Sequence, residues 1–435
     1  MRIAIVGSGP VGSITALMLA RRGHEVTLVD RDPGPTDSEA WQRKGVMQFN
    51  LPHFFRPQVR QAIEDEVPEL WSAILLAGGL PGLPPGFPEM MTGLQCRRST
   101  FEETVWRFTT AEPGITRRTG HADRLLIEGG KVTGLVVDGE ELYADLVVVV
   151  GGRANKLGDE LRAPGEGGSC GFSYAARQYR AKPGVELPDW GMPRYQIYDG
   201  YMTIVFPQDA QTLSALIVRP TADERLTELR HNHVFETAVA AIPHLAEWTD
   251  PERFEPFTDV LAGSNLTNAY RGQRDEAGHA TPGVVFLGDA VLTTNPAAGR
   301  GVPLGLQGAR ELVRLLDSDA GDLQAVAESF DEWCEANLRP WYDDHVEWDS
   351  SLLSRFAGED IDPDAHVPSY VVCDCAQVDP SIMMAAGPYL GMLAMPTIMD
   401  SVQEQARAVL RTGWRPAFAE GPSRDELVER VLAPV

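Results

Sequence analysis

The N-terminal glycines constrain this chain more than any other feature. Gly7, Gly9 and Gly12 stand at G-x-G-x-x-G spacing directly after the apolar run 2–6. That β-branched run is typical of a buried parallel strand, and apolar residues at helical spacing over 10–22 predict a helix behind the turn. In such a unit the first glycine permits a tight turn, the second lets the backbone approach a pyrophosphate, and the third lets the helix pack closely on the strand. The opening stretch therefore predicts a dinucleotide-binding unit.

An acidic residue stands where such a unit contacts an adenosine ribose. Gly23 ends the predicted helix, residues 25–29 predict a second strand, and Asp30 follows at its end. A carboxylate in this position accepts hydrogen bonds from ribose hydroxyls, and the helix N-terminus directs backbone N–H groups at the phosphates. The cofactor contacts expected here are Gly7, Gly9, Pro10, Val11, Gly12, Asp30 and Arg31. The motif by itself does not distinguish FAD from NAD(P).

A second element, at 281–316, favours FAD. Residues 284–287 predict another buried strand, and Gly288 and Asp289 follow at its carboxyl end. A turn rich in proline and glycine comes next, and apolar residues at helical spacing predict a helix from about Val302. A simple NAD-dependent dehydrogenase has no need of this second loop and helix.

This second element resembles the second FAD fingerprint of the flavoprotein monooxygenases of the para-hydroxybenzoate hydroxylase type. The resemblance implies that the Gly-Asp pair holds the ribityl chain and that the turn 296–301 runs beside the flavin ring. The helix that follows would direct its positive end at the N1–C2=O edge, where reduced flavin carries negative charge. The contacts so implied are Gly288, Asp289, Pro296, Gly299, Gly301 and Val302.

Two other segments fit the same family. Residues 94–102, LQCRRSTFE, resemble the family's arginine that precedes a hydrophobic and an acidic residue at the start of a helix beneath the cofactor. This resemblance assigns Arg98 to FAD, with Arg97 as the alternative. Residues 40–55 resemble the segment in which an arginine meets the FAD pyrophosphate or adenosine, and Arg43 is assigned to that role.

Because the flavin carries the difficult chemistry, no catalytic triad is expected, and the catalytic side chains are left unassigned. Gln48 and His53 fall on a loop predicted to pass near the isoalloxazine, although His53 is equally well interpreted as a polar loop residue without a contact. Arg300 either adds to the field at the ring or caps a carbonyl at the surface. The residues expected near the ring are Gln48, His53, Pro296 and Arg300.

One position departs from the family pattern. The family usually carries Asp-Gly after the strand equivalent to 146–150, whereas this chain has Gly151 and Gly152. In the family that aspartate supports both FAD and NADPH binding. Its absence here puts direct use of NADPH in doubt, so NAD(P)H is expected as a direct or an indirect electron donor, with a separate flavin reductase as partner in the second case.

The predicted fold class is α/β, with a Rossmann-like FAD-binding domain interleaved with an antiparallel substrate sheet. Strand and turn signals over 124–150 predict a β-meander on the FAD domain, and aromatic strands over 171–218 alternate with period two. The Met-rich stretch 383–396 either lines an apolar tunnel or is plain core. The predicted boundaries are 1–80, 95–170 and 265–340 for the FAD domain, 81–94 and 171–264 for the substrate sheet, and 341–435 for a helical C-terminal region.

The net charge and the cysteines restrict the expected partners, metal content and cellular location of the protein. The net charge of -24 repels phosphate backbones and anionic lipid, so neither nucleic acid nor a membrane is an expected partner. Five cysteines in a chain of this size suggest reduced thiols and a cytoplasmic location. Cys373-x-Cys375 has no second pair at matching spacing, so no metal is expected. No stretch approaches the roughly 20 apolar residues of a membrane helix.

The resemblance implies an FAD-dependent oxidoreductase with two open classes of reaction. In the first, a monooxygenase, reduced FAD and O₂ give a C4a-hydroperoxide that hydroxylates or epoxidises an apolar or aromatic small molecule, with a role in secondary metabolism. In the second, a dehydrogenase or reductase, hydride moves without oxygen insertion. A flavin-dependent halogenase is a third reading, but the W-x-W-x-I-P motif of that family is absent and lysines are scarce.

Overall fold

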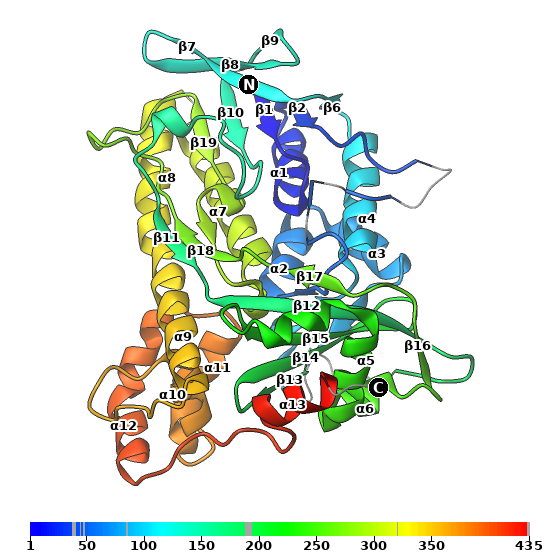
Figure 1. Cartoon of the computed structure of the whole chain (residues 1–435). Helices are drawn as coiled ribbons and strands as arrows, with labels where there is room; N and C mark the ends of the chain where they lie inside the picture. The colour runs from blue at the N-terminus through cyan, green and yellow to red at the C-terminus, as the bar shows by residue number, and fades with distance from the viewer. Residues whose placement is uncertain are drawn as a thin grey trace.

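The computed structural model describes residues 1–36, 41–43, 45–46, 48–83, 86–187, 194–319 and 321–432. A five-stranded sheet in the order β19-β10-β1-β2-β6 carries the N-terminal unit (Figure 1), and every neighbouring pair in it is parallel. Its strands are β1 (Arg2–Val6), β2 (Glu25–Asp30), β6 (Ile115–Thr119), β10 (Leu146–Val149) and β19 (Val284–Phe286). The predicted Rossmann-like sheet is confirmed.

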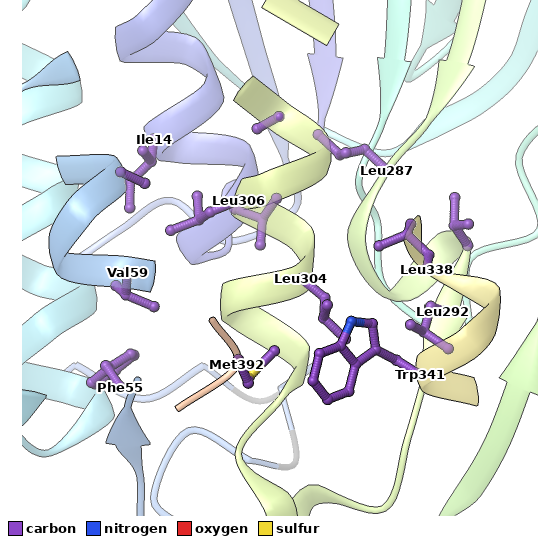
Figure 2. Close-up of a cluster of buried hydrophobic side chains, with 14 of the residues drawn as sticks. Ile14, Phe55, Val59, Leu287, Leu292, Leu304, Leu306, Leu338, Trp341 and Met392 are labelled. Atoms are coloured by element: carbon purple, nitrogen blue, oxygen red, sulfur yellow. The ribbon is translucent and has the colours of Figure 1, made fainter. Parts of the chain in front are cut away.

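Helix α7 (Gly301–Asp319) lies at the centre of the packing around this sheet. It contacts α1 (Pro10–Arg21), α2 (Pro57–Glu66) and α8 (Leu323–Asn337). Figure 2 shows Leu304 and Leu306 of α7 among buried side chains that include Ile14, Val59 and Trp341. The helix that begins at the predicted ring turn is therefore held on several sides by core side chains. The remaining helices of this half are α3 (Pro68–Leu76) and α4 (Arg98–Ala111).

The predicted meander is correct in its first two strands and wrong in its third. Strands β7 (Ala122–Glu128), β8 (Lys131–Val137) and β9 (Glu140–Tyr143) form an antiparallel sheet at one end of the molecule (Figure 1). The run expected as one strand up to Val150 divides at Asp145, and β10 joins the parallel sheet instead. The reason is a long-range contact, because the Asp145 carboxylate accepts a hydrogen bond from the Arg2 backbone N at 2.8 Å and so ties β10 to β1.

The second large sheet is antiparallel, as predicted. It has six strands in the order β13-β14-β15-β12-β16, with β17 also paired to β12. Along β14, Tyr201 and Val205 pack against the helices of one face, whereas Met202, Ile204 and Phe206 turn to the other face. The bounds are β12 (Phe172–Ala181), β13 (Arg194–Tyr198), β14 (Tyr201–Gln208), β15 (Thr212–Pro220), β16 (Phe254–Pro256), β17 (Leu261–Gly263), α5 (Asn232–Ala241) and α6 (Pro243–Thr249).

Two small sheets connect these parts. One joins β11, β18 and β20, and the other joins β3, β5 and β4. Their bounds are β3 (Phe54–Phe55), β4 (Leu80–Gly82), β5 (Gly93–Gln95), β11 (Glu166–Ser169), β18 (Thr267–Tyr270) and β20 (Leu292–Thr293). The last residues of β20 lead directly into the predicted ring turn.

The C-terminal residues are helical, and the last helix packs apart from the other C-terminal helices. Figure 1 shows α9–α12 stacked to one side, while α13 lies against α5 of the antiparallel sheet. There Leu427 and Val428 are buried, and Arg424 pairs with Asp223 at 2.7 Å. The bounds are α9 (Arg339–Phe356), α10 (Ser369–Cys375), α11 (Met383–Leu390), α12 (Gln403–Arg411) and α13 (Arg424–Val431). The division into three domains stays a prediction.

The methionines of 383–396 do not line a tunnel. Met392 is buried in the core beside α7 (Figure 2), and Met384 is 81% exposed. Within the described residues, only Tyr389, Leu390 and Gly391 of this stretch line the cavity described below. Among all the residues that the structure describes, no helix is both long enough and apolar enough to cross a lipid bilayer.

Candidate active site

One cavity of about 1610 Å³ runs from the glycine-rich turn to the antiparallel sheet. Pockets for single small ligands measure roughly 300–1,000 Å³, so this cavity has room for a dinucleotide and a second molecule. We call its two halves the cofactor end and the chamber. The cofactor end is lined by Gly7–Gly12, Asp30, residues 150–158, Gly288, Asp289 and residues 296–303. The chamber is lined chiefly by Tyr174, Met202, Ile204, Phe206, Leu216, Trp348, Tyr370 and Asp374.

The three N-terminal glycines fill three different structural needs. A Cβ on Gly7, whose φ is +112°, would lie 2.4 Å from the carbonyl oxygen of Val150. A Cβ on Gly12 would lie 2.0 Å from the carbonyl oxygen of Gly7. Around Gly9, by contrast, nothing lies within 4 Å of the Cβ position, and the residue faces the cavity. Gly7 and Gly12 thus allow the strand and helix to meet, and Gly9 leaves an open cradle that fits the pyrophosphate of FAD.

Asp30 faces the cavity at the end of β2, with part of its hydrogen-bonding capacity already used. One carboxylate oxygen accepts hydrogen bonds from Ser8 N at 2.6 Å and Ser8 Oγ at 2.9 Å, and it pairs with Arg43 at 2.9 Å. Burial works to raise the pKa of Asp30, but Arg43 and these hydrogen bonds outweigh burial and lower it. The carboxylate is therefore charged, and it lines the cavity where a ribose is expected. Arg31 lies beside it, exposed at the rim.

Arg43 and Arg98 belong to one buried network of charges. Arg43 pairs with Glu102 at 2.6 Å as well as with Asp30, and Glu102 also accepts a hydrogen bond from Nε of Arg98. Both arginines line the cavity, as expected. Arg97, the alternative to Arg98, does not line the cavity: its guanidinium pairs with Asp209, in the turn between β14 and β15, at 2.7 Å. A direct contact of Arg43 or Arg98 with FAD stays a prediction.

Gln48 and His53 meet at the free end of Arg98. One guanidinium nitrogen of Arg98 donates to Gln48 Oε1 at 3.0 Å and lies 3.3 Å from His53 Nε2. His53 Nδ1 lies 2.9 Å from the carbonyl oxygen of Leu51, so it carries the proton. Burial and the Arg98 charge lower the pKa of His53 to about 3, which makes the imidazole neutral at physiological pH. A contact of His53 or Gln48 with the flavin ring stays a prediction, as does the alternative of a loop residue without such a contact.

Asp289 is the second feature that fits the cofactor. It follows Gly288, which has φ +64°, and burial raises the pKa of its carboxyl. Among the described residues no side chain or backbone group is hydrogen-bonded to this carboxylate, although it lines the cavity. A partly buried carboxylate without a partner is costly, and the hydroxyl groups of a ribityl chain would satisfy it. The open cradle at Gly9 and this unpartnered acid together fit FAD.

The ring turn is tied to the C-terminal helices. Arg300 is buried and pairs with Asp344 of α9 at 2.6 Å, and it also donates to the Tyr389 hydroxyl of α11. Of its two expected roles, surface capping of a carbonyl is therefore wrong, because burial and these partners hold it inside. Its guanidinium lines the cavity beside Pro296, and a direct effect on the flavin stays a prediction. Helix α7 begins at Gly301, within one residue of expectation.

Several residues that support the turn carry no sequence signal of their own. Asn295 caps the short turn 296–298, and its amide donates to Asp349 of α9 at 2.9 Å. Asp349 also accepts a hydrogen bond from Asn268 at 2.8 Å, and burial raises its pKa to about 7. Arg56 donates to the carbonyl oxygen of Ala298 at 2.8 Å. These contacts join segments far apart in sequence, so no local motif announces them.

We expect the Gly9→Ala substitution to weaken FAD binding at least about tenfold without disturbing the fold. The reason is that the new methyl group enters the open cradle and no protein atom opposes it. The matched control is Gly168→Ala, whose Cβ position is equally open but lies outside the cavity. Titration of the apoprotein with FAD, followed by flavin fluorescence, measures the effect. Wild-type affinity in Gly9→Ala would contradict the assignment.

Asp289→Ala should separate cofactor binding from stability. Loss of hydrogen bonds to the ribityl chain should cost about 1–3 kcal/mol, or roughly 5- to 150-fold in FAD affinity. The apoprotein should be no less stable, because the variant removes a buried charge that has no partner. FAD titration and chemical denaturation of the apoprotein test the two halves, with exposed Asp343→Ala as control. Reduced apoprotein stability with unchanged FAD affinity would overturn the assignment.

Comparison with known sequences supports the cofactor assignment. Residues 2–82 match the family model described as FAD dependent oxidoreductase. D-amino acid dehydrogenase 2 of Ralstonia nicotianae is 44% identical over 50 residues, and this match covers only 12% of either chain. 3-demethoxyubiquinol 3-hydroxylase of Escherichia coli is 23% identical over 341 residues, which cover 72% of this chain and 79% of that protein.

Comparison with solved structures extends the likeness to nearly the whole chain. The flavin-dependent brominase Bmp2 superposes with a TM-score of 0.65 at 15% identity, covering 95% of this chain and all of the brominase. PqsL of Pseudomonas aeruginosa, described as a probable FAD-dependent monooxygenase, superposes with a TM-score of 0.60 at 15% identity, covering 82% of this chain and 98% of PqsL. At such identities the likeness is one of fold. The chain therefore carries an FAD-dependent oxidoreductase domain, on the fold that flavin-dependent monooxygenases and halogenases share.

Proposed function

We propose that this chain is a flavin-dependent monooxygenase that hydroxylates or epoxidises an apolar or aromatic small molecule, with a role in natural-product biosynthesis. The observation that carries the proposal is the single cavity, which joins the cofactor end to an apolar chamber. Oxygen insertion requires a substrate held against the reduced cofactor with water excluded. When bound and reduced, FAD supplies the activation of O₂.

The protein's own contribution is a fixed apolar surface beside the ring turn. Met202, Ile204 and Phe206 project from one face of β14 and line the chamber. Tyr174, on β12 of the same sheet, accepts a hydrogen bond from the backbone N of Ala297 in the ring turn at 3.2 Å. This bond sets the sheet at a defined distance from the turn, which positions a bound substrate with little freedom.

Apart from Asp289, which is assigned to the cofactor, the polar groups named near the ring turn are neutral or paired. His53 is neutral, and Arg300 is held by Asp344. Burial is the main reason that the pKa of the Cys373 thiol, which also lines the cavity, rises to about 12, so the thiol stays protonated and is a poor nucleophile. The described lining therefore favours chemistry carried by the cofactor over nucleophilic catalysis by a side chain.

Two alternative reactions share this fold. A halogenase is favoured by the likeness to Bmp2, but halogenases of the W-x-W-x-I-P type use a lysine near the substrate. Of the chain's lysines, Lys131 and Lys182 do not line the cavity, Lys156 lines its cofactor end, and Lys44 lies outside the described residues. A dehydrogenase is favoured only by the match over 50 residues to D-amino acid dehydrogenase 2.

We also propose a cytoplasmic protein that receives its electrons through a separate flavin reductase. The five cysteines are free thiols, which suits a reducing compartment. For the electron source, Gly151 is informative, because a Cβ there would lie 1.9 Å from the side-chain nitrogen of Asn155. Asn155 accepts a hydrogen bond from Leu157 N at 2.9 Å. Asn155 thus occupies the space that the family's aspartate, expected to support NADPH binding, would need.

The reaction class is tested by labelled oxygen. The FAD-loaded protein, reduced anaerobically with dithionite, is mixed with ¹⁸O₂, indole as aromatic probe and potassium bromide. We expect one labelled oxygen atom in the product, detected by mass spectrometry. A brominated product would support the halogenase instead. Slow reoxidation of the flavin with neither product would support a dehydrogenase and contradict the proposal.

The electron source is tested by anaerobic stopped-flow reduction of the bound FAD. We expect NADPH or NADH alone to bleach the flavin more slowly than the usual turnover range of roughly 1–10³ s⁻¹, and a flavin reductase or chemically reduced FAD to restore activity. Direct bleaching within that range would make the protein self-sufficient. Gly151→Asp combined with Asn155→Ala asks whether the family's aspartate increases the rate with NADPH.

A further inference from the structure

One acidic side chain in the chamber has no partner. Asp374 lies on α10 and lines the cavity, and within the described residues its carboxylate accepts no hydrogen bond and forms no ion pair. The other acids already assigned have roles elsewhere: Asp30 pairs with Arg43, and Asp289 lies at the cofactor end. Asp374 is therefore a chamber feature that cofactor binding does not explain.

Arg355 is the positive charge that acts on the pKa of Asp374, but its guanidinium contacts other groups. It donates to the carbonyl oxygen of Pro416 at 3.0 Å, and its guanidinium carbon lies 4.9 Å from the Phe418 ring centroid. No ion pair within 4.0 Å joins it to Asp374. Burial raises the pKa of Asp374 to about 6, with Arg355 opposing that shift, so the carboxylate is largely charged at neutral pH.

Aromatic side chains line the same chamber as this carboxylate, and Tyr370 lies one helical turn before Asp374 on the same face of α10. Trp348 and Tyr370 line the same chamber with ring centroids 6.0 Å apart. Tyr195 of β13 also lines the cavity and is 57% exposed at its mouth. The Tyr195 phenol and the Asp374 carboxylate lie within electrostatic reach of each other. A carboxylate among aromatic faces is a recognition site for an ammonium group.

We propose that the substrate of this chain is an apolar or aromatic molecule carrying a protonated amine, which Asp374 binds at the mouth of the chamber beside Tyr195, Tyr370 and Trp348. This inference rests on the proposed function for the reaction and adds the substrate class. A partly buried carboxylate without a partner is stabilised by an incoming cation. The net charge of -24 also raises the local concentration of cations over anions.

The same geometry gives the substrate a direction. Cys373, the neighbour of Asp374 on α10, lines the same cavity, as does Arg300 of the ring turn. An amine at Asp374 would leave the apolar part of the molecule to extend past Cys373 toward the ring turn. The amine would then serve as the anchor, and the apolar end would be the part oxidised.

Calorimetric titration of the FAD-loaded protein at neutral pH tests the amine site without turnover. The probes are phenethylamine, its neutral isostere 2-phenylethanol, and the anion 3-phenylpropionate. We expect the amine to bind at least about tenfold more tightly than the alcohol and the anion to bind most weakly. Asp374→Asn should remove this preference and leave the alcohol's affinity nearly unchanged. The control Asp343→Asn, at an exposed position on α9, should keep the preference.

Tyr195→Leu provides a second variant at an exposed rim position, where folding is not at risk. It should weaken the amine more than the alcohol, because it removes one aromatic face. Equal affinity for amine and alcohol in the wild type, an amine preference that survives Asp374→Asn, or no binding of any probe would overturn the proposal.

The experiments can refute the proposed monooxygenase reaction and the proposed amine site independently of each other. Labelled oxygen in indole without an amine preference would leave the monooxygenase standing and remove the amine site. An amine preference that depends on Asp374, without oxygen insertion into any probe, would keep the site and remove the reaction.

Discussion

Helix α1 approaches the end of β1 so closely that a single methyl group at Gly12 would lie 2.0 Å from the carbonyl oxygen of Gly7. Gly7 in turn lies close against Val150, which follows β10, so two parallel strands and a helix meet at one point. This contact aims the first backbone N–H groups of α1 into the cavity. Because no side chain fits at the contact, the cofactor end depends on glycine at both positions.

The cofactor end is then shaped by alternating charges. Asp30, Arg43, Glu102 and Arg98 follow one another from the end of β2 to the beginning of α4. Removing one member would leave a buried charge unpaired, at a cost of about 3–5 kcal/mol, so the network holds its geometry strongly even if its net contribution to stability is small. Asp289 lies outside this network, and its carboxylate keeps its hydrogen-bonding capacity free where the ligand is expected.

The C-terminal helices complete the other half of the site. Asp344 of α9 pairs with Arg300 within the ring turn, Asp349 of α9 binds Asn295 just before it, and Tyr389 of α11 accepts a hydrogen bond from the same arginine. Helix α10 supplies the wall of the chamber, including Asp374. A region that the sequence marks only as helical thus positions the turn beside the cofactor and builds part of the substrate surface.

The parts of the fold and site that were predictable from sequence are those encoded by local patterns. The strand–glycine–helix unit, the Gly288-Asp289 pair and the start of α7 each depend on neighbours in sequence, because backbone conformation and helix capping act over a few residues. The same holds for the alternation in β14, which showed in advance that one face of the antiparallel sheet would line a cavity.

What the sequence left open depends on contacts between distant segments. Arg97 and Arg98 are adjacent and alike in sequence, but Arg97 pairs with Asp209 in the β14–β15 turn, whereas Arg98 lines the cavity. The surface role expected for Arg300 was wrong because α9 and α11 cover it, and β10 left the meander because Asp145 binds Arg2. Burial and long-range ion pairing arise only when the chain is folded, so Asp374 could be identified as an unpartnered acid only in the tertiary structure.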